Sequence, residues 1–174
     1  AFGYEEAIGY CCDSHRVPDK DGITALITVL RLAAGLKADG RTLADRLDEI
    51  ALTHGVHTTG QLSVRVADLS IIANAMQTLR ANPPAKLLGE PLLITDLATP
   101  SADSHLPPTD AIELTGRRLH VVARPSGTEP KLKCYLEVRI TESSGNLEED
   151  RLQAADDLAA LRDEMASALG LSAG

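Results

Sequence analysis

Residues 118–140 of the chain are RLHVVARPSGTEPKLKCYLEVRI, and their pattern of apolar and polar residues is the strongest indication of the fold class. In its second half the apolar residues alternate with polar ones, at Leu132, Cys134, Leu136, Val138 and Ile140. A period of two is typical of a strand with one buried face. The first half predicts another strand over 118–123, which forms a hairpin with residues 111–114 through Gly116. The polar segment RPSGTEP therefore lies between two strands.

Helical periodicity appears on both sides of this stretch. Asp21 and Asp68 are expected N-caps of helices that end near Gly40 and before Pro83. Apolar periodicity also predicts a short helix over 42–54 and a long helix over 146–169. Strands are also expected over 62–66 and 92–97, and an exposed loop over 98–109. The predicted fold class is α+β, a mostly antiparallel sheet flanked by helices. It comprises residues 56–174, and a helical remnant of another domain comprises residues 1–55.

Composition excludes several classes of partner and location. A net charge of -8 and an aromatic content of 2% argue against nucleic acid, which needs positive charge and stacking surfaces. We expect no membrane association, because no apolar run approaches the length of a span and the start resembles no signal sequence. Cys11, Cys12 and Cys134 show no disulfide spacing, which favours the cytoplasm. The start lacks Met and resembles a cut end.

The segment from Arg124 to Lys131 combines a guanidinium, two hydroxyls, an ammonium and Gly127 in one turn. The guanidinium can meet two phosphate oxygens, the hydroxyls can donate to others, and Gly127 allows the backbone N–H groups to converge. Lys131 and Lys133 share one face of the following strand and add positive charge. The alternative is a polar turn whose hydroxyls only satisfy backbone groups.

The string RPSGTEPKLK resembles the phosphate-binding loop in the last domain of the α-D-phosphohexomutases, the family of phosphoglucomutases and phosphomannomutases. The resemblance implies a C-terminal domain of the TATA-box-binding-protein-like fold. It also implies that the phosphate of the sugar that is not reacting is bound by Arg124, Ser126, Gly127, Thr128 and Lys133.

The opening GYEEAIGY resembles the sugar-binding loop of the third domain in that family. Glu5 keeps the family's acidic position, whereas Ala7 stands where Ser is usual, which removes one hydroxyl contact. The resemblance thus implies sugar binding by Glu5 and Ala7, and identifies residues 1–55 as the end of an α/β domain. The alternative for Glu5 and Glu6 is a solvated acidic turn.

The family's phosphoserine motif and its Asp-rich magnesium loop do not occur in this sequence. We therefore expect a C-terminal part of an isomerase that holds no catalytic residue and no metal ligand, and is inactive alone. The implied partners are glucose or mannose phosphates, their bisphosphate and the remaining domains of the enzyme, with magnesium bound elsewhere. The alternative is a non-catalytic module that binds sugar phosphates or another protein.

Two other kinds of site are disfavoured. Zinc would need paired ligands, but Cys11 and Cys12 are adjacent and no Cys-x-x-Cys accompanies His54 and His57. The glycine patterns of nucleotide-binding loops are also missing from the sequence.

Overall fold

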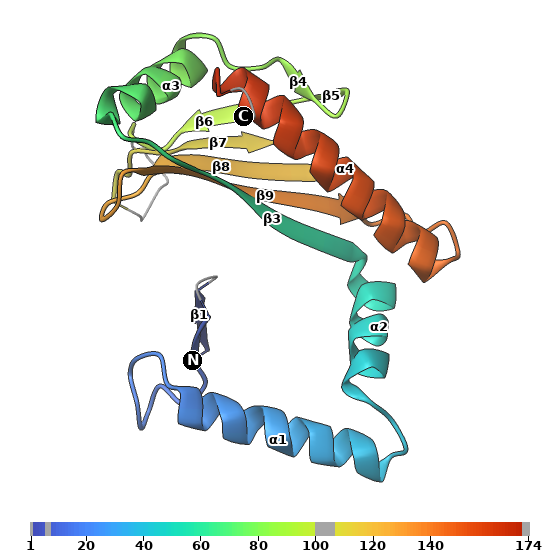
Figure 1. Ribbon diagram of the computed structural model, residues 1–174. Helices are drawn as coiled ribbons and strands as arrows, with labels where there is room; N and C mark the ends of the chain where they lie inside the picture. Colours follow the sequence, from blue (N-terminus) through green and yellow to red (C-terminus); the bar gives the residue numbers. More distant parts are fainter. Residues whose placement is uncertain (1, 6–7, 100–106, 172–174) are drawn as a thin grey trace. The chain divides into compact units, whose positions relative to one another are not determined.

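The structure is a computed structural model that describes residues 2–5, 8–99 and 107–171. It divides into two compact units, Ala1–Ile50 and Ala51–Gly174. The division lies within helix α2 (Leu43–His54), a few residues before the boundary that the sequence suggested between residues 55 and 56. Figure 1 shows the elements of each unit along the chain.

The larger unit is built on a five-stranded sheet in the order β3-β9-β8-β7-β6. Every neighbouring pair in it is antiparallel. The strands are β3 (Val56–Arg65), β6 (Leu93–Asp96), β7 (Ile112–Thr115), β8 (Leu119–Pro125) and β9 (Lys131–Ile140). The longest ladder joins β3 and β9 over ten residue pairs, from Val56 opposite Ile140 to Arg65 opposite Lys131.

Alternation along the strands separates the two faces of this sheet. In β9 the residues Leu132, Cys134, Leu136 and Val138 are buried, while the residues between them are partly exposed. β8 alternates in the same way, with Leu119, Val121 and Ala123 buried. The strand period predicted from the sequence is confirmed, and it produces one apolar face and one polar face.

Both helices of this unit pack on the apolar face (Figure 1). Helix α3 (Leu69–Ala81) begins after Asp68, whose carboxylate accepts from the Ser70 N–H at 2.8 Å. Helix α4 (Leu147–Ala168) begins after Asn146, whose side chain accepts from the N–H groups of Glu148 and Glu149. These caps satisfy N–H groups that a helix leaves without partners. The predicted α+β architecture is confirmed.

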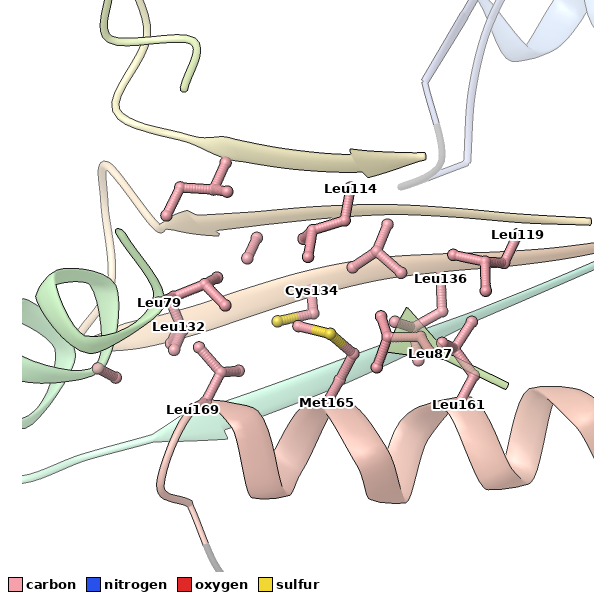
Figure 2. Packing of buried hydrophobic residues seen from close by; sticks show 14 of the residues in the cluster. Leu79, Leu87, Leu114, Leu119, Leu132, Cys134, Leu136, Leu161, Met165 and Leu169 are labelled. Atoms are coloured by element: carbon pink, nitrogen blue, oxygen red, sulfur yellow. The ribbon is translucent and has the colours of Figure 1, made fainter. Parts of the chain in front are cut away.

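The core between helices and sheet is aliphatic (Figure 2). Leu79 from α3 and Leu161 and Met165 from α4 are fully buried against the sheet. Cys134 lies among them with 0% exposure. Since the chain has one Phe and no Trp, close packing of branched aliphatic side chains provides most of the apolar burial.

A two-residue hairpin joins β4 (Lys86–Leu87) to β5 (Glu90–Pro91). Its turn residues Leu88 and Gly89 have φ angles of 49° and 74°, as a hairpin turn that follows the twist of the strands requires. The Leu88 N–H donates to the Glu164 carboxylate at 2.7 Å, which ties the turn to α4.

The smaller unit contains a short antiparallel ladder of β1 (Gly3–Glu5) and β2 (Gly9–Cys11), followed by helix α1 (Gly22–Ala38). Asp21 caps α1 as predicted and accepts from Ile23 and Thr24. The apolar stripe of α1 is largely exposed, with Ile23 at 71% and Leu30 at 58%. Leu36 is the one buried apolar side chain among the described residues of this unit.

Candidate functional site

Residues 126–130 form the loop between β8 and β9, and backbone hydrogen bonds close it. The Ser126 N–H donates to the Lys131 carbonyl at 2.8 Å, and the Lys131 N–H donates to the Glu129 carbonyl at 2.7 Å. The Val66 N–H donates to the Pro130 carbonyl at 3.0 Å and extends the contact with β3 past the ladder. The ends of the loop are therefore fixed by the sheet.

Gly127 lies at the exposed tip of this loop. Its φ is not in the left-handed region, and a Cβ built there would meet no atom within 4 Å. Neither backbone strain nor crowding within the described residues therefore requires glycine here. The absent side chain leaves open space beside the backbone N–H groups, which is what a closely approaching anion needs.

A polar row crosses three strands at the base of the loop. Lys133 lies opposite Ser63 on one side and opposite Arg124 on the other. All three lie on the polar face, which no helix in the described residues of this unit covers. The Arg124 Nε is buried and has no hydrogen-bond partner among the described residues. The sequence did not identify Ser63, because only strand register places it in this row.

A second row lies one step nearer the loop, where Arg65 is opposite Lys131. Glu129 joins the two: its carboxylate accepts from Arg65 Nη2 at 2.7 Å and from Lys131 Nζ at 3.0 Å. The hydrogen bond from Lys131, with the charges of Lys131 and Arg65, lowers the pKa of Glu129. Sequence reasoning missed Arg65 and the carboxylate of Glu129.

Together the two rows bring four cations and one carboxylate to a single end of the sheet, on a chain with a net charge of -8. The cations are Arg65, Arg124, Lys131 and Lys133. A local excess of positive charge on an acidic protein attracts anions to that place. With the hydroxyls and N–H groups of residues 126–128, this end can hold a phosphate dianion.

The other predicted contact, Glu5, lies in the smaller unit at the end of β1. Its carboxylate pairs with Lys20 Nζ at 3.3 Å, and both side chains are about half exposed. Gly9 allows this approach, since a Cβ there would lie 2.4 Å from Lys20 and 2.5 Å from Glu5. Ala7 lies outside the described residues.

The described ranges contain no group of three or more His, Cys, Asp or Glu side chains that could hold a metal ion. The magnesium that the family resemblance implies is expected in domains outside this sequence. Of the helices in those ranges, none has both the length and the apolar character needed to cross a membrane.

Residues 109–155 match the phosphoglucomutase/phosphomannomutase C-terminal domain, and this span includes the loop and both strands that flank it. A probable phosphomannomutase of Haemophilus influenzae is 46% identical over 140 residues, which cover 79% of this chain and 28% of that protein. A phosphoglucomutase of Staphylococcus aureus is 30% identical over 153 residues, covering 79% and 27%.

Among solved structures, the open form of a Paramecium phosphoglucomutase, pp63/parafusin, superposes with a TM-score of 0.68 at 18% identity. The match covers 98% of this chain and 31% of that one, and shows the shared fold. The chain thus spans less than a third of the length of each of these three proteins. It belongs to the phosphoglucomutase/phosphomannomutase family and carries that family's C-terminal domain.

Proposed function

We propose that this chain is the part of a phosphohexomutase that holds the non-reacting phosphate of a hexose phosphate. The observation that carries the proposal is the buried, unpartnered Nε of Arg124 at the base of the loop. A buried donor without a partner costs free energy, of about 1–3 kcal/mol, which a ligand oxygen would remove. A phosphate oxygen is the acceptor that best suits a guanidinium among further cations.

The remaining contacts follow from the chemistry of the loop. Arg124 and Lys133 would neutralise the dianion from the sheet, while Ser126 and Thr128 would donate hydroxyl hydrogen bonds. The N–H groups around Gly127 would complete the set, as in other backbone anion sites. Such a set recognises phosphate and leaves the sugar ring to other contacts, for which we propose Glu5 and Ala7.

In the whole enzyme we propose an isomerase that converts hexose 1-phosphate to hexose 6-phosphate through a phosphoserine and a bisphosphate intermediate. The phosphoserine and the magnesium site would lie in domains outside this sequence. The present residues would contribute binding energy: a distal phosphate held firmly orients the reacting hydroxyl and helps to close the site. Alone, the chain should bind sugar phosphates and transfer nothing. We also propose a cytoplasmic location, which suits the free thiols Cys11, Cys12 and Cys134.

The test is an NMR titration of the isotope-labelled chain with glucose 1,6-bisphosphate, followed at the amides of Ser126, Gly127 and Thr128. Saturable shifts at these amides are expected, with a Kd of about 1 mM because the other domains are absent. Glucose should produce none of them, and mannose 1,6-bisphosphate should produce them as well, since the phosphate is what the loop binds. The proposal would be overturned if the loop amides did not shift at ligand concentrations well above the expected Kd of about 1 mM.

A non-catalytic binding module is the second candidate, because the same phosphate contacts would serve it. An assay of the full-length protein separates the two. Conversion of glucose 1-phosphate or mannose 1-phosphate to the 6-phosphate supports the mutase. Binding in the loop without any conversion by the full-length protein favours the module.

A further inference from the structure

Arg65 and Lys131 face each other directly across the β3·β9 ladder, on the polar face of the sheet. Like charges in this arrangement repel, and directly opposed pairs weaken a sheet. The Glu129 carboxylate contacts both cations, at 2.7 Å and 3.0 Å. One carboxylate thus offsets the repulsion at the point where the ladder ends and the loop begins.

Glu129 is also fixed through its backbone. Its carbonyl accepts from the Lys131 N–H, and the next residue, Pro130, accepts from the Val66 N–H. The residue therefore joins three places: the end of β3, the start of β9 and the loop itself. It directly follows Ser126, Gly127 and Thr128, so the position of Glu129 determines the positions of their N–H groups and hydroxyls.

We propose that Glu129 is a positioning residue for the phosphate-binding loop, acting through Arg65 and Lys131. The inference rests on the proposed function, because it assigns a role within the same site. Glu129 holds residues 126–128 in a conformation ready to bind phosphate, so that less conformational entropy is lost when the ligand arrives. It does not itself touch the phosphate.

Simple electrostatics predicts the opposite effect and makes the idea testable. A carboxylate near a dianion repels it, so removing the charge of Glu129 should tighten binding if the residue acts through charge alone. If the residue acts by position, the same substitution releases the loop and weakens binding. The direction of the change distinguishes the two roles.

The experiment compares the 174-residue chain with its Glu129→Gln variant in two measurements. Hydrogen exchange of the amides of residues 126–128, without ligand, should be faster in the variant. The affinity for glucose 1,6-bisphosphate should fall about three- to tenfold, as expected for losing two exposed ion pairs that order a short loop. Asp156→Asn removes one exposed negative charge from α4 and should change neither quantity.

Arg65 provides the second arm. Arg65→Met should reproduce both effects, and Arg65→Lys, which keeps a cation for Glu129, should restore most of the protection and affinity. The double variant Arg65→Met with Glu129→Gln should bind the bisphosphate about as weakly as the weaker-binding single variant, because the two residues act as one unit. Additive losses would contradict the coupling.

Unchanged or tighter binding by Glu129→Gln, with unchanged exchange in the loop, would overturn the inference and leave the proposed function intact. A wild-type chain that binds no bisphosphate would instead overturn the proposed function and the phosphate part of the inference. The exchange measurement would still decide whether Glu129 orders the loop.

Discussion

Arg124 on β8 and Lys133 on β9 lie directly opposite each other at the base of the loop. Two cations in opposed positions repel, and no carboxylate ion pair is observed for either among the described residues. The pair therefore favours the binding of an anion. In the neighbouring pair, Arg65 and Lys131, the carboxylate of Glu129 already bridges the two cations. A bound phosphate would offset the repulsion between Arg124 and Lys133, as Glu129 offsets the repulsion between the neighbouring cations.

Replacing Arg124 by Ala should weaken the binding of glucose 1,6-bisphosphate by about 10- to 100-fold, because a hydrogen bond to a charged group contributes about 1.5–3 kcal/mol. Arg124→Lys keeps the charge but not the planar fork, so its affinity should lie in between. NMR titration at the Ser126 and Thr128 amides measures the change. Arg162→Ala, at an exposed position of α4, is the control for the lost charge and should bind like the wild type. Equal affinities for the Arg124 and Arg162 variants would contradict a role for Arg124.

Cys134 should resist alkylation in the folded chain, whereas Cys11 and Cys12 should react. Burial raises the pKa of the Cys134 thiol to about 12, so almost no thiolate is present at pH 8, and the side chain is 0% exposed. Cys11 and Cys12 are partly exposed. Mass spectrometry after a short pulse of iodoacetamide tests this, with a sample in urea as the control in which all three should be modified. Labelling of Cys134 at the rate of Cys12 in the native chain would show that the core opens readily.

Much of the larger unit could be predicted because its sequence follows simple periods. The alternation around Cys134 predicted β9 and its buried face, and Asp68 marked the start of α3 with a capping side chain. Both signals depend on residues that are close in sequence, and those residues themselves form the predicted strand and the predicted helix cap. The loop was identified by the composition of residues 124–131, which is also a local property.

Features that depend on distant residues could not be predicted in this way. Ser63 joins the site only through strand register, and Arg65 meets Glu129 across 64 positions of sequence. In the hairpin at Leu88 and Gly89 only the glycine is a turn signal, because Leu rarely adopts the positive φ that it has there with its N–H held by Glu164. The stripe of α1 predicted the helix correctly, but periodicity alone does not provide the surface that would bury it.

Leu161→Ala should lower the free energy of unfolding by about 2–5 kcal/mol, the usual range for removing a buried Leu side chain. Leu161 is fully buried between α4 and the sheet (Figure 2). Leu152→Ala on the same helix is the matched control, because Leu152 is 60% exposed and its truncation should cost little. Urea unfolding followed by circular dichroism measures both. A similar loss for the two variants would contradict the packing of α4 described here.

Asp150 lies in the first turn of α4 and is 5% exposed, although it carries a charge. The Ser143 hydroxyl and the Ser144 N–H donate to its carboxylate, the latter at 2.9 Å. These hydrogen bonds, led by that from Ser143, lower the pKa of Asp150. A carboxylate near a helix N-terminus is also favoured by the helix dipole.

The lowered pKa of Asp150 makes part of the stability depend on pH. Because the folded pKa is below the unfolded value of about 3.9, this contribution is complete above that value and is lost as the pH falls through the folded pKa. Asp150→Asn removes the titrating group and keeps the size of the side chain. The difference in urea midpoint between wild type and Asp150→Asn should therefore be greatest at pH 7 and shrink below about pH 4. Asp156→Asn, at an exposed position of the same helix, should show a small difference at every pH. A gap for Asp150→Asn that stays constant from pH 7 to pH 3 would mean that Asp150 stabilises the turn by shape rather than by charge.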